Sequence, residues 1–465
     1  MDAYTPAWEI AGAVRSKKIS AREATEAALK RVDDRNPALN AFTYLDPERA
    51  LRQADGIDEA IARGEDPGML AGVPMGVKDL EGVEGMPLTM GSLAFKEQVA
   101  HEDSVQVSRL RRAGAVFLGK TNTPEFGYKG FTVNRLHGAT GNPWNPERTP
   151  GGSSGGSSAA VAAGMVPLCT ASDGGGSIRA PAAFSGCYGI KPSAGRIPRA
   201  GLFAPHWGTH STIGPMAWTV RDAARYIDAT AGAHPNDLDS LDAPPGGYEA
   251  AVMGETPPVW RIAWSPDLGY AAVDPQVKRV CAEAAKALGE ALGAEVEEVN
   301  PGFSNPMPYW YAMAAANDTR TLDSFTPEQR ELLEPGFVAF AEQARGLTAM
   351  QVMEALDERH QLNRALTAIF ETYDLLVTPA VACTAFPKNG PPPSKIGRAE
   401  VGPAGYIAFT PPFNMTGHPA ASIPAGLAKD GLPVGLQVVA PRHADKFLLA
   451  VSAAYEASRP WGRPG

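Results

Sequence analysis

The stretch TPGGSSGGSSAAVAAGMVPLCTASDGGGSIRAPAAFSGCYGIKP, residues 149–192, decides how this 465-residue chain is interpreted. Its segment GGSSGGSS (151–158) has the composition of a flexible linker. However, it passes directly into SAAVAAG (158–164), a predicted helix whose small side chains allow close packing against neighbouring backbone. The glycine run DGGGS (173–177) could then turn several N–H groups towards one point, as an oxyanion site requires. The flanking residues therefore favour a built site over a linker.

Composition narrows the class of protein. The net charge is −9, with 44% hydrophobic and 20% charged residues, which is typical of a soluble globular protein with a large core. The sequence has no stripe of basic residues, so we expect no nucleic-acid partner. The eight histidines form no HExxH motif and the four cysteines have no metal-ligand spacing, which disfavours a zinc hydrolase. Because there is neither a secretory signal nor an apolar run of about 20 residues, we expect a cytoplasmic protein without membrane contact.

The order of predicted elements indicates an α/β protein. Two buried-strand patterns, GVPMGVKDL (72–80) and AVFLGKTN (115–122), flank a helical pattern at 103–114, and such alternation favours a sheet covered by helices on both faces. No repeat or composition break marks a domain boundary. We therefore expect one domain over 1–465, in four parts: N-terminal helices (1–65), a core (66–240), a peripheral helical insertion (about 305–373) and a C-terminal part of the core (374–465).

Several motifs together carry a family resemblance. Besides 149–192, they are GVPMGVKDL (72–80), GKTNTPEFG (119–127), GNPWNPERTPGG (141–152), GPMAWTVRDAA (214–224) and FNMTGHPAASIPAG…GLPVGLQVV (413–439). In these motifs the chain resembles the amidase signature family of serine hydrolases, and residues 240–375 match that family least. The resemblance implies a single large α/β domain with a central mixed, mostly parallel twisted sheet. It also implies that the glycine- and serine-rich stretch forms a wall of the active site.

The resemblance places a Ser–cis-Ser–Lys triad on Ser177, Ser153 and Lys78. Ser177 would be the nucleophile, Ser153 would relay its proton to Lys78, and the Gly152–Ser153 peptide would be cis. Elementary chemistry agrees, because a serine hydroxyl needs a nearby base and no histidine lies in the dense motifs. Lys78 follows a buried apolar run, where desolvation would favour its neutral form. The reaction would pass through an acyl-enzyme without a metal or organic cofactor.

The glycine run supplies the expected oxyanion hole, made of the N–H groups of Gly174, Gly175, Gly176 and Ser177. Gly174 departs from the threonine usual in the family, and we expect a looser loop for that reason. Three residues are expected to support the triad: Ser154, Asp173 and Arg179. Asp173 and Arg179 would pair across the loop, although Arg179 could instead bind a substrate carboxylate.

Candidates for the substrate pocket are Gly127, Tyr128, Phe203 and Trp207. For Phe203 and Trp207, core packing is an equal alternative. An apolar pocket would suit an uncharged amide, anilide or carbamate as the small-molecule partner.

Two other functions remain open. The first is the A subunit of a glutamyl-tRNA amidotransferase, which typically has Gln after the SIR motif and a SLDQIGP segment. This chain has Ala180 and HSTIGPM (210–216) instead, which favours a stand-alone amidase. We expect a monomer or homodimer. The second is a non-catalytic binding subunit of the same fold, which the three filled triad positions argue against.

Overall fold

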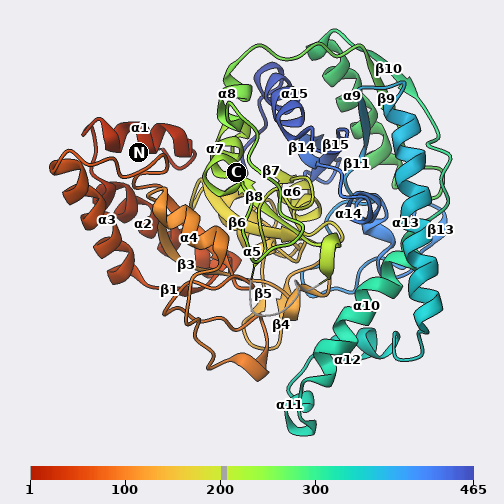
Figure 1. Ribbon diagram of the computed structural model, residues 1–465, viewed down its shortest axis with the longest axis horizontal. Helices are drawn as coiled ribbons and strands as arrows, with labels where there is room; N and C mark the ends of the chain where they lie inside the picture. The colour runs from red at the N-terminus through yellow and green to blue at the C-terminus, as the bar shows by residue number, and fades with distance from the viewer. Residues whose placement is uncertain (1, 201–206) are drawn as a thin grey trace.

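A single large sheet organises the molecule. The computed structural model describes residues 2–200 and 207–465, and eleven strands of this part form one sheet (Figure 1). In order across the sheet they are β1 (Phe42–Leu45), β3 (Val116–Thr121), β2 (Pro74–Lys78), β6 (Leu168–Asp173), β8 (Thr212–Ala217), β7 (Tyr188–Lys191), β14 (Ala420–Leu427), β15 (Pro433–Val439), β11 (Leu375–Pro379), β9 (Arg261–Trp264) and β10 (Glu295–Glu298).

The sheet is mixed, as predicted, but the expectation of a mostly parallel sheet is wrong. Among the described strands, β3–β2–β6 and β11–β9–β10 are the parallel groups. The other neighbours, including the whole centre from β6 to β11, pair antiparallel. The centre is antiparallel partly because β14 and β15 form a hairpin, closed by the short turn 428–432. Parallel pairing occurs where a crossover helix separates two strands, as α4 (Val105–Arg112) separates β2 from β3.

Helices cover both faces of the sheet. Two short helices, α5 (Gly155–Ala162) and α6 (Arg179–Ser185), pack together on one face, whereas α7 (Val220–Thr230), α9 (Pro275–Leu292) and α15 (Asp445–Ser458) pack on the other. The stretch 151–158 is fully buried, and its second half opens α5. The linker interpretation is therefore excluded. Two further short helices are α8 (Tyr248–Met253) and α14 (Pro411–Met415). Two small strand pairs lie outside the large sheet: β4–β5 (Val133–Asn134, Gly138–Ala139) and β12–β13 (Lys395–Ile396, Ala399–Glu400).

Helix α9 shows how sequence fixes these elements. Asp274 accepts a hydrogen bond from Gln276 N–H at 2.8 Å, and Pro275 occupies the first helical position. Gly293 ends the helix at a positive φ of 67°. The buried side chains recur every three or four residues and face the sheet: Val277, Val280, Cys281, Ala284, Ala285 and Leu288.

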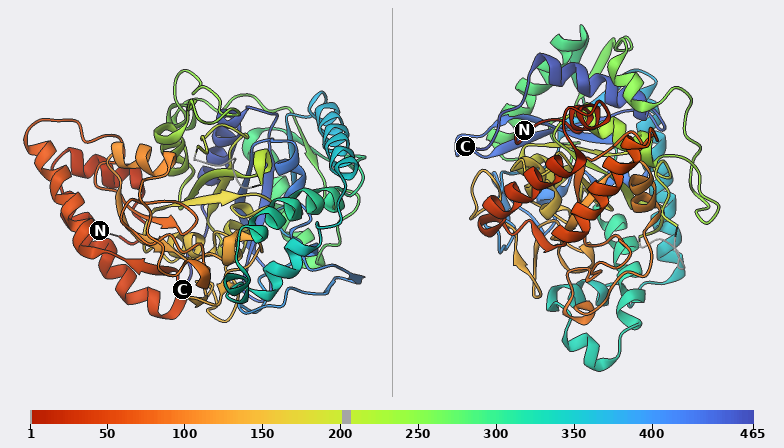
Figure 2. Two further views of the ribbon diagram at one scale, coloured as in Figure 1. Left: turned by 60° about the horizontal axis from the view of Figure 1, so that its bottom comes forward. Right: turned by 90° about the vertical axis from the view of Figure 1, so that its left-hand side faces the viewer.

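The N-terminal part contains the predicted helices α1 (Ala7–Arg15), α2 (Ala21–Leu39) and α3 (Pro47–Ala62) at one end of the molecule (Figure 2). Ser20 and Glu23 form the capping box that opens α2. The segment 1–65 is not wholly helical, however, because β1 pairs antiparallel with β3 at the edge of the sheet.

The segment 305–373 is helical, as predicted. It forms α10 (Met307–Asp323), α11 (Pro327–Glu331), α12 (Pro335–Glu342) and α13 (Ala349–Phe370), on the side opposite α1–α3 (Figures 1 and 2). Within the described part of the chain, no helix combines the length and apolar character needed to cross a lipid bilayer.

Candidate active site

Neighbouring strand ends bring the three predicted triad residues to one region. Lys78 is the last residue of β2, and Ser177 follows β6, which pairs parallel with β2. Parallel neighbours end at the same edge of a sheet, so both residues reach that edge. Ser153 lies in the loop that leads into α5, and a backbone bond from Ser154 N–H to the Ser177 carbonyl (3.3 Å) joins this loop to the one that carries Ser177.

The amine of Lys78 is fully buried among hydroxyl groups. Its Nζ lies 2.7 Å from Ser153 Oγ, 2.8 Å from Ser154 Oγ and 2.9 Å from Ser172 Oγ. Burial lowers the pKa of Lys78 from 10.5 to about 7, although the negative charges of nearby carboxylates partly oppose this shift. A neutral amine has two N–H donors and one lone pair. It can therefore accept the Ser153 proton while it donates to the other two hydroxyls.

The two serines of the predicted relay border one cavity. Ser153 is buried and Ser177 is half-buried, and both line a cavity of about 640 Å³. The Gly152–Ser153 peptide is cis, as the resemblance implied. Ser153 and Ser177 thus border a space that a small molecule could occupy, and Lys78 contacts Ser153 from behind it.

Contacts on both sides hold the glycine loop 174–176. The indole N–H of Trp310 donates to the Gly174 carbonyl at 2.9 Å, and the Thr410 hydroxyl donates to the Gly175 carbonyl at 2.7 Å. That Gly174 loosens the loop stays a prediction, but glycine is required by the packing there, because a Cβ would meet the Trp207 ring at 2.5 Å. The ring occupies the space that a side chain would need.

One predicted oxyanion donor is already engaged. The Gly176 N–H donates to Asp173 Oδ1 at 2.7 Å. This finding corrects the four-donor expectation, because a bonded N–H is not free to hold a substrate oxygen. The N–H groups of Gly174, Gly175 and Ser177 remain the proposed donors.

Asp173 and Arg179 form a fully buried ion pair, as predicted, with Arg179 Nη2 2.8 Å from Asp173 Oδ1. The positive charge and hydrogen bonds of Arg179, with a bond from Asn414, hold the pKa of Asp173 far below its usual range despite burial. Arg179 also donates to Gln437 Oε1 at 2.7 Å and to the Thr410 carbonyl at 2.9 Å. Since the guanidinium is buried and engaged, it braces the loop and is not placed to bind a substrate carboxylate.

The cavity is lined by an apolar, partly aromatic wall with polar residues beside it. Of the predicted pocket residues, Gly127 and Trp207 line it, whereas Tyr128 is not among the described residues that do. Tyr128 donates to Glu334 at 3.1 Å instead, and Phe203 lies outside the described residues. The other lining residues are Leu80, Glu81, Met90, Phe95, Phe126, Ser172, Gly174, Arg199, Ser211, Arg320, Thr321, Ser324 and Phe325.

The family model for amidases matches residues 23–449, most of the chain. The chain belongs to the amidase signature family. It is 40% identical to an acylamidase from Rhodococcus erythropolis, over 98% of this chain and 96% of that protein. It is also 38% identical to the A subunit of the glutamyl-tRNA(Gln) amidotransferase from Acidothermus cellulolyticus, over 97% of this chain and 93% of that one.

Solved structures of two hydrolases match the fold over nearly the whole chain. A bacterial aryl acylamidase of the amidase signature family superposes with a TM-score of 0.93 at 33% identity, covering 98% of this chain and 97% of that one. A 6-aminohexanoate cyclic dimer hydrolase superposes with a TM-score of 0.91 at 31% identity, covering 100% and 99%.

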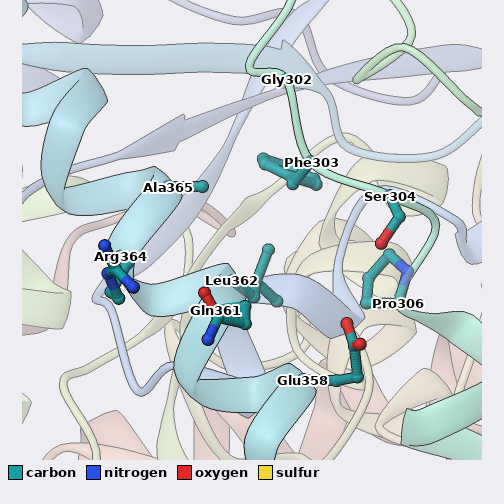
Figure 3. A pocket seen from close by; sticks show the side chains of 9 residues that line it. All are labelled: Gly302, Phe303, Ser304, Pro306, Glu358, Gln361, Leu362, Arg364 and Ala365. Atoms are coloured by element: carbon teal, nitrogen blue, oxygen red, sulfur yellow. The ribbon is translucent and has the colours of Figure 1, made fainter.

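A second pocket, of about 470 Å³, lies apart from the triad of this amidase-family chain. It is bounded by the loop at 302–306 and by α13, from which Glu358, Gln361 and Arg364 extend towards it (Figure 3). None of the triad residues lines this pocket.

Sequence reasoning missed the residues that α10 brings to the site. Trp310 contacts the glycine loop, and Arg320 and Thr321 line the cavity. The first part of the segment 305–373 therefore contributes to the site, which the sequence analysis did not predict. Ser172 was also missed as a partner of Lys78. Its position in a buried strand, five residues before Ser177, was the one available signal.

Proposed function

We propose that this amidase-family hydrolase is a stand-alone serine amidase that cleaves the C–N bond of its substrate through an acyl-enzyme on Ser177. The observation that supports this proposal most is the buried amine of Lys78, 2.7 Å from Ser153 Oγ with a pKa near 7. An amine of this kind can take a proton at neutral pH, whereas an ordinary lysine cannot.

In the proposed mechanism, Ser177 Oγ attacks the substrate carbonyl carbon. Its proton passes to Ser153, and the proton of Ser153 passes to Lys78 Nζ. The N–H groups of the glycine loop hold the resulting oxyanion. When the intermediate collapses, Ser153 protonates the leaving nitrogen and recovers a proton from Lys78. Water then attacks the Ser177 ester by the same relay, which releases the acid and restores the enzyme.

The proposed substrate is an uncharged amide, anilide or carbamate. Phe95, Phe126, Phe325 and Trp207 border the cavity and would favour an apolar or aromatic group. The acylamidase and aryl acylamidase similarities support this class. A carbamate is included because its carbonyl would be attacked by the same groups.

The alternative function is that of an amidotransferase A subunit, supported by relatives of 34–38% identity over nearly the whole chain. A non-catalytic binding subunit is the second alternative. The test is to assay the purified chain alone on 4-nitroacetanilide, an aryl carbamate and glutamine, with Ser177→Ala as the control. Anilide or carbamate hydrolysis that disappears in the control supports the proposal. Glutamine hydrolysis alone would favour the amidotransferase, and no turnover by a folded chain would favour the binding subunit.

A further inference from the structure

Trp310 contacts the glycine loop from outside the family's sequence motifs. It lies in α10, is almost fully buried, and donates its indole N–H to the Gly174 carbonyl at 2.9 Å. Trp310 is not among the described residues that line the cavity. Any effect of Trp310 on the reaction therefore passes through the loop.

A bond to the Gly174 carbonyl also fixes the N–H of Gly175. Both groups belong to one peptide unit, which is trans, since Gly174–Gly175 is not one of the cis peptides. In a planar trans peptide the C=O and the N–H point in opposite directions. By holding the carbonyl, Trp310 directs the Gly175 N–H away from the indole ring.

The next peptide unit is held at both ends. The Gly175 carbonyl accepts from Thr410 at 2.7 Å, and the Gly176 N–H donates to Asp173 at 2.7 Å. Its orientation therefore does not depend on one contact. The preceding peptide unit, Gly174–Gly175, differs. Trp310 holds the Gly174 carbonyl, and the Gly175 N–H is one of the proposed oxyanion donors.

Close packing explains why this arrangement needs glycine. A Cβ on Gly175 would lie 2.2 Å from the Trp310 ring, and one on Gly174 would lie 2.5 Å from the Trp207 ring. The two indoles contact each other edge to face, with centroids 5.4 Å apart. Trp207 also donates to Asp318 of α10 at 3.2 Å. The loop thus rests against a fixed aromatic pair.

We propose that Trp310 is a positioning residue for the oxyanion hole, which orients the Gly175 N–H towards the developing oxyanion. This inference rests on the proposed acyl-enzyme mechanism. Oxyanion donors act in the transition state, so a misdirected donor lowers kcat more than it raises KM.

The test is Trp310→Phe, which removes the indole N–H and keeps an aromatic ring. Removal of a whole oxyanion donor costs on the order of 100- to 1000-fold in kcat. We expect a loss of about 10-fold or more on a nitroanilide, with KM changed less than about 3-fold. Affinity for a trifluoromethyl ketone, which forms a tetrahedral adduct, should fall by a similar factor. The matched control is Trp461→Phe, because that indole donates to the Trp218 carbonyl at 3.0 Å far from the loop. Its kcat should equal that of the wild type.

Thr410→Val provides a second comparison. Asp173 still holds the Gly176 N–H in this variant, so we expect a smaller loss of kcat than in Trp310→Phe. Unchanged kcat and unchanged inhibitor affinity in Trp310→Phe would overturn the proposal, and so would a rise in KM alone. A Trp310→Phe chain that fails to fold would also overturn it, because Trp310 would then be structural. An active Ser177→Ala variant would instead refute the proposed function itself.

Discussion

Replacement of Lys78 by arginine should abolish amide hydrolysis at every pH at which the protein is folded. The shift in the pKa of Lys78 from 10.5 to about 7 means that its surroundings, burial above all, disfavour the charged form by about 5 kcal/mol in total. At pH 7 about half of the amines are therefore neutral, compared with about one in 3000 for an unperturbed lysine. Arginine stays charged throughout this range. We expect kcat/KM to fall on the order of 1000-fold or more.

The assay is kcat/KM on a nitroanilide as a function of pH, for the wild type, Lys78→Arg and Lys78→Ala. Since the base must lose its proton, wild-type kcat/KM should rise with pH through an inflection near 7. Both variants should lack this inflection. Unfolding curves of each variant control for the strain of a larger or missing side chain. An inflection near 7 that persists in Lys78→Ala would refute the assignment of this base.

A matched nitrophenyl ester separates the two roles of Lys78. An amide nitrogen must be protonated as it leaves, whereas a nitrophenolate leaves without help. Lys78→Ala should therefore lose less kcat/KM on the ester than on the anilide. Equal losses would mean that Lys78 does not serve leaving-group protonation, and small losses on both would remove it from the triad.

Three further outcomes are expected. Ser177→Ala should lose turnover by orders of magnitude and keep its unfolding midpoint; more than a few per cent residual activity would contradict the nucleophile assignment. A fluorophosphonate should inactivate the protein and EDTA should not, so zinc-reversible loss in EDTA would point to a metallohydrolase. Burial raises the pKa of Glu456 from 4.5 to about 8, with a contribution from Asp222. The folded state therefore retains a proton that the unfolded chain releases. The free energy of unfolding should fall as the pH rises from about 4.5 to about 8. Urea unfolding of Glu456→Gln should show a weaker fall; an unchanged slope would exclude Glu456 as its source.

Local signals predicted much of the fold. The capping box of Ser20 and Glu23 and the Asp274–Pro275 start of α9 depend only on residues close in sequence, and such local patterns indicate where a helix begins. The hairpin of β14 and β15 likewise follows from its turn. The direction of the central strands could not be predicted, because β8 enters between β6 and β7 through pairings that no local pattern encodes.

The functional site was likewise predicted only in part, because some of its residues come from sequence motifs and others from long-range packing. The motif pattern indicated Lys78 and Ser153, and the structure places their side chains in contact. Trp310 and Arg320 reach the site through the packing of α10, more than 100 residues beyond the glycine loop. Tyr128 was wrongly expected in the pocket because Gly127, its neighbour, does line it, whereas Tyr128 turns towards Glu334.

The most direct test of the central claim is to locate the acyl group during turnover. The protein is mixed with a slowly hydrolysed aryl carbamate, quenched in acid, digested and examined by peptide mass spectrometry. In an O-aryl carbamate the phenolate is the better leaving group, so Ser177 displaces it by breaking the C–O bond. The proposed nucleophile therefore predicts one carbamoyl group, attached to Ser177. A carbamoyl group on Ser153 or another residue, or turnover with no covalent adduct at any time, would contradict it.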